Sequence, residues 1–450
     1  MTPTSWARDW RGALAGVTLA LALGALALGA VTGCGDITGA ASPDVVQTTV
    51  LNNASGALVQ RAGAIADFAE SYSGQALYSG LITDELLDAA GGIRPADRRQ
   101  LSTTSFDNYP YDLLSEARIQ ALRAVPSLKS YAPTPAWRIG ELFAYEGFVE
   151  TFFAENMCSG TPLGVVVNGT PAFGPTLTRG ELLRRALADF DSAGVYAVAE
   201  DSIGVMATVG VARALLDSGD FPDAARIAAT VPAGYQFQTQ YASTAAQINQ
   251  LFEQVVATIE VSVSDLEGEN GLDFVSANDP RVQTVNLGPA IFGTPNIVAP
   301  VVDRSPTAPM VLASAVEARL IQAEAALPVH GGSGQAWLNI LNALRTDGTQ
   351  TAGVFNPGGG NVAGLAPLTD PGSDTARVSL LFRERAFWLF LTGHRQGDMR
   401  RLIRQYGRPT ETVFPTGPYY LGGTYKSAVA FQPFGESFNP NFHGCVDNNP

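Results

Sequence analysis

Apolar positions recur at helical spacing through much of the chain. Hydrophobic side chains follow one another three or four residues apart from Val50 to Tyr72 and from Leu113 to Leu128, which is the spacing of one face of a helix. The run from Ala136 to Met157 is rich in aromatic rings and predicts a further helix. Thr178, with Glu181 three residues later, has the form of a capping box, so the next helix should begin there. These patterns predict a mainly α-helical protein.

Several helices are expected to come in pairs. The run from Ile203 to Leu216 is followed by the turn Gly219-Asp220-Phe221 and a second, alanine-rich helix, as in a tetratricopeptide-like pair. Residues 312–327 with 334–344 predict a second pair, and Ser379 to Tyr406 a third. The intervals between the pairs are irregular, which argues against a regular solenoid. We therefore expect a core of tetratricopeptide-like helical pairs (about residues 50–230 and 310–406) with irregular loop-rich insertions at 231–310, 347–376 and 407–450.

The third pair has an unusual distribution of polar residues. It is polar at Arg383, Glu384 and Arg385, and then apolar on every side from Ala386 to Leu391, which is typical of a buried helix. Gly393 suits the left-handed backbone that often ends a helix. In the following helix Asp398 and Arg401 are three residues apart and can pair on one face.

The segments after the first helix predict loops. Asp84 and Glu85 follow it directly, and residues 102–112 combine Phe106, Tyr109, Pro110 and Tyr111 in a stretch that resembles loop more than helix. A glycosidase needs two carboxylates on either side of a bond, and adjacent residues on a helix point apart. A solvated face or a helix cap is therefore the expected role of Asp84 and Glu85.

The N-terminus has the features of an export signal. Arg8 and Arg11 precede an apolar run from Ala13 to Val31, and small residues follow it, as in a secretory signal peptide. The run is also long enough for a transmembrane anchor. The end of the run, Val31-Thr-Gly-Cys34, resembles a bacterial lipobox, in which Cys34 becomes the lipidated first residue. We therefore expect a signal peptide at 1–33, a lipid-proximal tether at 34–49 and a single domain at 50–450.

Composition narrows the class of partner. The chain has 450 residues, of which 46% are hydrophobic and 16% charged, and its net charge is −14. Removal of residues 1–33 takes away Arg8, Arg11 and Asp9, a net charge of +1, and so changes −14 to −15. Such an acidic chain is not expected to bind nucleic acid. The 47 glycines and 28 prolines indicate long connecting loops.

Two cysteines remain if Cys34 carries lipid. Cys158 and Cys445 are then an even pair in an exported protein, for which a disulfide is the natural hypothesis. The alternative is two unrelated buried thiols.

The stretch E-R-x-F-W-L-F-x-x-G-H-R-x-x-D-x-x-R resembles the C-terminal signature of the SusD/RagB family of outer-membrane nutrient-binding lipoproteins. It departs from the family at Leu391 and Thr392, where an acidic residue is common before the glycine. The matching positions, called the signature residues below, are Glu384, Arg385, Gly393, Arg395, Asp398 and Arg401.

Five further stretches resemble the family in the same order along the chain. They are the "D-E" segment at Asp84, the D-P-R run at Asp279–Arg281, the helical runs at residues 317–326 and 338–345, and the ending at residues 431–441. The resemblance implies a lipid-anchored protein of the cell outer membrane. It would bind an oligosaccharide or another oligomeric nutrient and deliver it to a TonB-dependent (SusC-like) outer-membrane transporter.

Motifs for catalysis or cofactors are not recognisable in the sequence. The three histidines, His330, His394 and His443, have no metal-ligand spacing, and neither a phosphate-binding loop nor a nucleophile elbow occurs. We therefore expect no enzyme activity, no cofactor and no metal.

A binding surface for sugars needs exposed aromatic rings beside polar groups. In the family, ligand contacts come from loops, so the resemblance implies that loop residues contact the ligand here. The alternative function is a protein-interaction scaffold of the cell envelope. The candidate ligand-binding residues are Tyr72, Tyr78, Phe106, Tyr109 and Tyr111 in the first excursion, and Phe292, Asn296 and Arg304 in the insertion at 231–310.

Overall fold

The computed structural model divides the chain after Leu51 into two units, of which the second, Asn52–Pro450, is compact. It describes residues 51–91, 95–101, 105–198, 202–244, 247–291, 295–301, 305–346, 362 and 365–446, without the side chains of 105–108. The expected signal peptide, Cys34 and the tether therefore lie outside the described residues. In the described part of the chain, no helix is both long enough and apolar enough to cross a bilayer.

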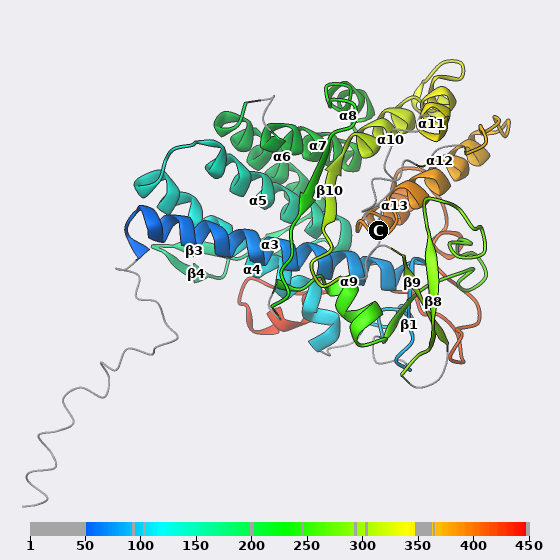
Figure 1. The fold of residues 1–450 in the computed structure, drawn as a ribbon, viewed down its shortest axis with the longest axis horizontal. Helices are drawn as coiled ribbons and strands as arrows, with labels where there is room; N and C mark the ends of the chain where they lie inside the picture. Colours follow the sequence, from blue (N-terminus) through cyan, green and yellow to red (C-terminus); the bar gives the residue numbers. More distant parts are fainter. Residues whose placement is uncertain are drawn as a thin grey trace, which may run out of the picture. The chain divides into compact units, whose positions relative to one another are not determined.

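Helices dominate the second unit (Figure 1). The first half contains α3 (Ala54–Ile82), α4 (Ser105–Tyr131), α5 (Trp137–Asn156), α6 (Arg179–Tyr196), α7 (Ser202–Ser218) and α8 (Phe221–Ala228). The second half contains the short α9 (Gln250–Phe252), which continues as a π-helical turn (Glu253–Ala257), and then α10 (Ala315–Ala325), α11 (Ala336–Thr346), α12 (Asp374–Trp388) and α13 (Arg395–Arg404). The predicted mainly α fold is confirmed.

Strands form only two-stranded antiparallel pairs in the described residues. Two of the pairs are hairpins of consecutive strands, and the other three join strands that are not consecutive in the chain. The pairs are β1 (Leu86–Asp88) with β7 (Val261–Val263), β2 (Thr161–Pro162) with β5 (Thr176–Leu177), β3 (Val165–Val167) with β4 (Thr170–Ala172), β6 (Gln236–Thr239) with β10 (Met310–Ser314), and β8 (Thr284–Pro289) with β9 (Asn296–Pro300).

The expected helical pairs are present. Helices α7 and α8, α10 and α11, and α12 and α13 follow one another as predicted. Gly219, between α7 and α8, has φ +82°, a conformation that favours glycine. The capping box at Thr178 and Glu181 also forms, with both reciprocal hydrogen bonds.

Close approach of α5 and α6 depends on glycine. A Cβ atom at Gly147 would lie 2.8 Å from the ring of Phe190, and one at Gly140 would lie 2.9 Å from the carbonyl oxygen of Ala193. Because real Cβ atoms do not approach this closely, any larger residue would push the two helices apart. The ring of Phe190 instead meets that of Phe148 edge-on, with centroids 5.1 Å apart, a favourable aromatic geometry.

Two elements are longer than the sequence predicts. Helix α3 continues beyond Tyr72 to Ile82, and α4 already begins at Ser105, so the loop expected at 105–112 is wrong. Pro110 suggested a break, because proline removes one helical hydrogen bond. Tertiary packing outweighs this loss: the ring of Tyr111 lies 5.7 Å from that of Phe153, and Tyr109 lies 5.9 Å from Tyr78.

The apolar stretch 386–391 is buried as predicted, although the helix ends earlier. All six side chains are at most 5% exposed. Helix α12 stops at Trp388, Leu391 has φ +55° and Gly393 has φ +75°. The turn between α12 and α13 therefore lies in the core.

Two hydrophobic clusters fill the interior. The larger joins α3 to α8 and includes Phe68, Phe148 and Leu216. The smaller joins α10 to α13 and includes Trp337 and Trp388. The polar groups described next lie where these clusters meet.

Candidate functional site

The signature residues form a buried network of ion pairs. The guanidinium of Arg385 holds Asp398 with two hydrogen bonds of 2.8 Å, and Arg401 holds the same carboxylate at 2.6 Å. The predicted Asp398–Arg401 pair is thus confirmed. Arg401 also contacts Glu324 of α10 and Asp217 of α7. Burial opposes ionisation of Asp398, but the two guanidinium groups outweigh it and lower the pKa of Asp398.

Arg395 joins this network to the end of α3. It binds both carboxylate oxygens of Asp84, at 2.7 and 2.8 Å, and Asp84 is fully buried. The neighbouring Glu85 is 1% exposed and accepts a hydrogen bond from the backbone N–H of Leu391 at 3.2 Å. The solvated face or helix cap expected for Asp84 and Glu85 is therefore wrong. Burial raises the pKa of Glu85 to about 8.

Motifs far apart in the sequence meet at Glu384. Arg281 of the D-P-R run and Arg345 of α11 donate to its two carboxylate oxygens, at 2.7 and 2.6 Å. The shared carboxylate fastens the insertion that carries Arg281 to the helical pairs α10–α11 and α12–α13. The D-P-R run, helix α11 and the signature residue Glu384 thus interact directly.

The space around position 393 explains why a glycine is found there. A Cβ atom there would lie 2.2 Å from the side-chain oxygen of Gln75, and the amide of Gln75 donates to the Gly393 carbonyl at 3.0 Å. All six signature positions therefore hold the helices together. Ligand has no access to them in this conformation, since the charged signature residues are at most 7% exposed.

Most of the candidate ligand-binding aromatics are not on exposed loops. Tyr72 lies within α3, fully buried, and its hydroxyl donates to the carbonyl of Val311. Tyr78 and Tyr111 are each 4% exposed, and the hydroxyl of Tyr111 donates to the carbonyl of Pro162 at 3.0 Å. The expectation of exposed loop rings is wrong for these three residues, because tertiary packing extends both helices over them.

Of the remaining candidate residues, two can be placed and three lie outside the described side chains. Tyr109 is half-buried in α4, and Asn296 is exposed at the start of β9. The side chain of Phe106, and the whole of Phe292 and Arg304, lie outside the described residues. The candidates that can be placed therefore do not assemble into one site.

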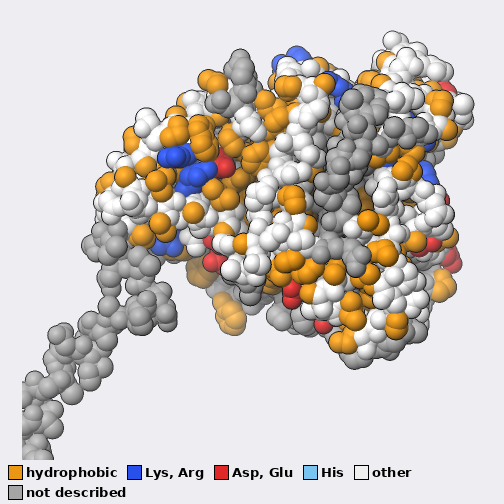
Figure 2. Space-filling model, in the orientation of Figure 1, with side chains coloured by type: hydrophobic (Ala, Val, Ile, Leu, Met, Phe, Trp, Pro, Cys, Tyr) orange, Lys and Arg blue, Asp and Glu red, His pale blue; other side chains and the backbone are white. Residues whose placement is uncertain are grey.

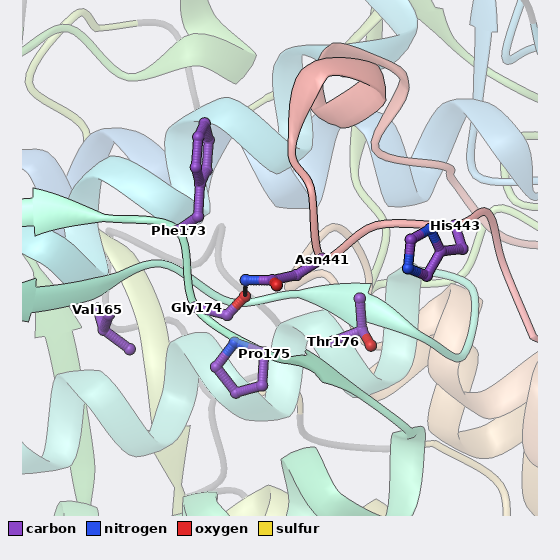
Figure 3. A pocket seen from close by; sticks show the side chains of 7 residues that line it. All are labelled: Val165, Phe173, Gly174, Pro175, Thr176, Asn441 and His443. Atoms are coloured by element: carbon purple, nitrogen blue, oxygen red, sulfur yellow. Dashed lines mark hydrogen bonds between the residues drawn. The ribbon is translucent and has the colours of Figure 1, made fainter.

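A hollow elsewhere on the surface has the composition of a binding site. It has a volume of about 460 Å³ and is open to solvent. It is lined by the segment around β3, β4 and β5 and by the C-terminal segment, namely by Val165, Phe173, Gly174, Pro175, Thr176, Asn441 and His443. In Figure 3 the ring of Phe173 stands at one side of this hollow and His443 at the other. The volume falls within the range of small-ligand sites, about 300–1,000 Å³.

Three links fasten the two walls of the hollow. Cys158 and Cys445 form the expected disulfide, with Cα atoms 5.7 Å apart. The backbone N–H of Val446 donates to the carbonyl of Ser159 at 2.8 Å. The side-chain amide of Asn441 donates to the carbonyl of Gly174 at 2.9 Å, the contact drawn as a dashed line in Figure 3.

Gly174 allows this wall to close. A Cβ atom there would lie 1.8 Å from the carbonyl oxygen of Leu163, so any other residue would displace the backbone. The glycine therefore permits the backbone position that places Phe173 beside the hollow and the Gly174 carbonyl against Asn441.

The side chains of the hollow suit a polyhydroxylated ligand. Phe173 is 59% exposed and offers an apolar ring face, while Thr176, Asn441 and His443 offer hydrogen-bonding groups. Phe173 and His443 were not among the site residues expected from the sequence. The signal for Phe173 was present, because Thr170-Pro-Ala-Phe173-Gly-Pro175 is a turn-rich stretch that leaves one aromatic ring with little local structure to cover it.

In the described part of the chain, no group of three or more His, Cys, Asp or Glu side chains is arranged to hold a metal ion.

No protein-family model matches the sequence, and no curated protein matches it at significance. Solved structures do match. A SusD superfamily protein from Parabacteroides distasonis is 12% identical, with a TM-score of 0.61 over 89% of this chain and 99% of that protein. A SusD superfamily protein from Bacteroides vulgatus is 13% identical, with a TM-score of 0.56 over 79% of this chain and 89% of that protein. A laminarin-binding SusD-like protein is 11% identical, with a TM-score of 0.52 over 81% of this chain and 96% of that protein.

These similarities extend over most of both chains, and the motif residues form buried ion pairs around α12 and α13. The chain therefore has the SusD-like fold.

Proposed function

We propose that this protein is a lipid-anchored binding protein of the outer membrane that captures an oligosaccharide nutrient. It passes the sugar to a TonB-dependent (SusC-like) transporter. Cys34 carries the lipid. The function is binding and release, with no covalent chemistry.

The observation that carries this proposal is the full-length likeness to SusD-like structures, one of which is described as laminarin-binding. Fold alone does not define function, so the site must supply the specificity. The hollow at Phe173 is the part of the described surface that we assign to sugar. Its exposed ring can pack against the apolar face of a pyranose, and Thr176, Asn441 and His443 can bond to hydroxyl groups.

The transporter is tested by a pull-down. The protein is tagged at its C-terminus and recovered in detergent from native membranes, and its partners are identified by mass spectrometry. A large β-barrel with a plug domain in near-equal amount is the expected result. Recovery of periplasmic or soluble partners alone would instead favour a protein-interaction scaffold.

The sugar site is tested by a glycan-binding screen followed by Phe173→Ala. Loss of the ring is expected to weaken binding of the best glycan about 5- to 30-fold, the equivalent of about 1–2 kcal/mol for one aromatic contact. Phe438→Ala is the matched control, because Phe438 is 92% exposed and does not line the hollow. Equal affinity of both variants and the wild type would remove the hollow from the proposal.

A further inference from the structure

Four helix ends meet at one end of the helical bundle. The side chain of Gln60, near the start of α3, donates to Ser127 near the end of α4 at 3.1 Å. Arg61 of α3 pairs with Glu141, near the start of α5. The ring of Phe143 in α5 stacks on Tyr196 at the end of α6, with centroids 5.8 Å apart. We call this region the bundle end.

Large apolar side chains are exposed at the bundle end. Leu58 and Val59 near the start of α3 are 37% and 63% exposed. Tyr131 at the end of α4 is 41% exposed, and Val195 and Val198 at the end of α6 are 80% and 61% exposed. A single exposed apolar residue is ordinary. A group of them on converging helix ends indicates a surface that something covers.

Cations and aromatic rings lie together in the same region. The Lys129 ammonium is 4.8 Å from the ring of Phe143 and 5.2 Å from that of Tyr196. Arg61 and Arg138 lie 5.0 and 5.7 Å from the ring of Trp137. Figure 2 shows Lys and Arg side chains among hydrophobic ones over the end of the bundle where α3 begins. Glu141 offsets the charge of Arg61, and Asp191 is exposed nearby on α6. With Lys129 and Arg138, these five described groups carry a net charge of +1.

The chain arrives at the bundle end from the proposed lipid anchor. Residues 35–51 separate Cys34 from Asn52, where the compact unit begins. A chain of 17 residues can span at most about 60 Å. A bilayer that holds the lipid at Cys34 therefore lies within reach of the start of α3.

We propose that the bundle end rests on the headgroup layer of a phospholipid bilayer. The proposal depends on the lipid anchor in the proposed function. Trp137, Tyr131 and Tyr196 take the interfacial position that amphipathic rings prefer. Lys129 and Arg138 face lipid phosphates, and Val59 and Val195 enter the apolar edge of the headgroup region.

The charged groups named at the bundle end are less acidic than the chain as a whole. The mature chain carries a net charge of about −15, counted from −14 for the whole sequence. An anionic membrane surface repels most of such a molecule and attracts its basic region within about one Debye length. The bundle end is therefore the side on which a lipid-anchored copy comes to rest.

Tryptophan emission offers a direct test on the lipidated, full mature chain. Of the five tryptophans, Trp6 and Trp10 fall in the signal peptide, and Trp337 and Trp388 are fully buried. Only Trp137 remains to report contact. The protein is reconstituted in vesicles of phosphatidylcholine and phosphatidylglycerol, with or without a nitroxide on the phosphatidylcholine headgroup. We expect the nitroxide to quench the wild type, and Trp137→Phe to lose the quenchable part of the emission.

Paired variants make the test specific. Lys129→Glu with Arg138→Glu, and Val59→Asp with Val195→Asp, are each expected to reduce quenching about twofold or more, because they oppose interfacial placement. Val329→Asp is the control: Val329 is 49% exposed and lies between α10 and α11.

The possible failures are distinguishable. Protein that does not float with the vesicles overturns the lipid anchor and with it this proposal. Protein that floats but shows no quenching of Trp137, or equal quenching in all variants, overturns the membrane contact alone. Quenching that disappears only when the transporter is added would assign the bundle end to that protein instead. None of these readouts involves sugar, so the nutrient-binding proposal stands or falls separately.

Discussion

Arg401 joins three helices through one side chain. Its guanidinium contacts Glu324 of α10, Asp217 of α7 and Asp398 within α13, and it is 1% exposed. Replacement by a neutral residue removes the guanidinium that Glu324 and Asp217 contact and leaves Asp398 with Arg385 alone in a dry interior. Removal of one partner of such a buried pair is usually far more costly than the pair is stabilising.

Arg401→Ala is therefore expected to lower the free energy of unfolding by about 3–5 kcal/mol. Denaturation in urea, followed by circular dichroism, measures this loss. Arg226→Ala is the control, because Arg226 and Asp223 form a surface pair at 2.9 Å with side chains 65% and 50% exposed, worth about 0–1 kcal/mol. Similar losses in both variants would contradict a structural role for the buried network.

Glu85 makes stability depend on pH. Burial raises its pKa from the ordinary 4.5 to about 8, so the folded protein binds this proton more tightly than the unfolded chain does. The resulting stabilisation is fully present below pH 4.5 and is lost as the pH rises through about 8.

Glu85→Gln keeps the shape of the side chain and removes the titration. Near pH 4.5 the variant should be about as stable as the wild type, and by pH 8 it should be more stable by on the order of 1–3 kcal/mol. Thermal denaturation of both proteins across this range checks the sign. A difference that stays constant with pH would show that Glu85 does not titrate there.

At the scale of elements, the C-terminal segment owes its position to remote contacts. It has little regular structure of its own beyond the short 3₁₀ turn at Phe434–Phe438. The disulfide to Cys158, the Val446–Ser159 hydrogen bond and the Asn441–Gly174 hydrogen bond hold it against β2 and β5. One wall of the hollow thus depends on a link across 287 residues of sequence.

Removal of this link by Cys158→Ser with Cys445→Ser should lower the free energy of unfolding by up to about 5 kcal/mol, because it frees a long loop in the unfolded chain. Glycan affinity should fall as well, since Asn441 and His443 are no longer held opposite Phe173. Denaturation and glycan binding are measured on the same samples. Unchanged glycan affinity in a folded double variant would separate the hollow from the binding site.

Elements set by local sequence were predictable, and elements set by distant contacts were not. The capping box at Thr178 and the turn at Gly219 each depend on residues within a few positions, and both form as expected. Strands β6 and β10 pair Gln236 with Ser314, and nothing local indicates that partner. The hollow was missed because Phe173 and His443 belong to segments far apart in the sequence, which the disulfide and two hydrogen bonds bring together.

At the scale of the whole molecule, the buried charges join two hydrophobic clusters. Arg401 reaches from the α10–α13 cluster to Asp217 of α7 at 3.3 Å, and Arg395 of α13 reaches Asp84 after α3 at 2.7 Å. This is also why the family resemblance could be recognised from sequence: the motif residues are the ones that join the parts. Surface loops carry no such constraint, and the exposed loop positions expected for Tyr72, Tyr78 and Tyr111 were wrong.

Ion pairs between the clusters should make them unfold together. In a mature Trp137→Phe chain, tryptophan emission comes from Trp337 and Trp388, both in the α10–α13 cluster. Far-UV circular dichroism reports on helices of both clusters. We expect the two probes to give one transition, with midpoints within about 2 °C, which is the test for cooperative unfolding. Proteins of this size often unfold in steps, so coincidence would be informative.

Arg401→Ala in the Trp137→Phe background tests whether the ion pairs of Arg401 cause this coupling. Loss of the link to Asp217 should separate the two transitions, with the emission change at the lower temperature, because the smaller cluster then has fewer contacts with the rest of the protein. Transitions that already differ in the parent chain would mean that the clusters fold independently. Transitions that stay together in the variant would mean that Arg395 and Asp84, with the apolar contacts, are sufficient to couple them.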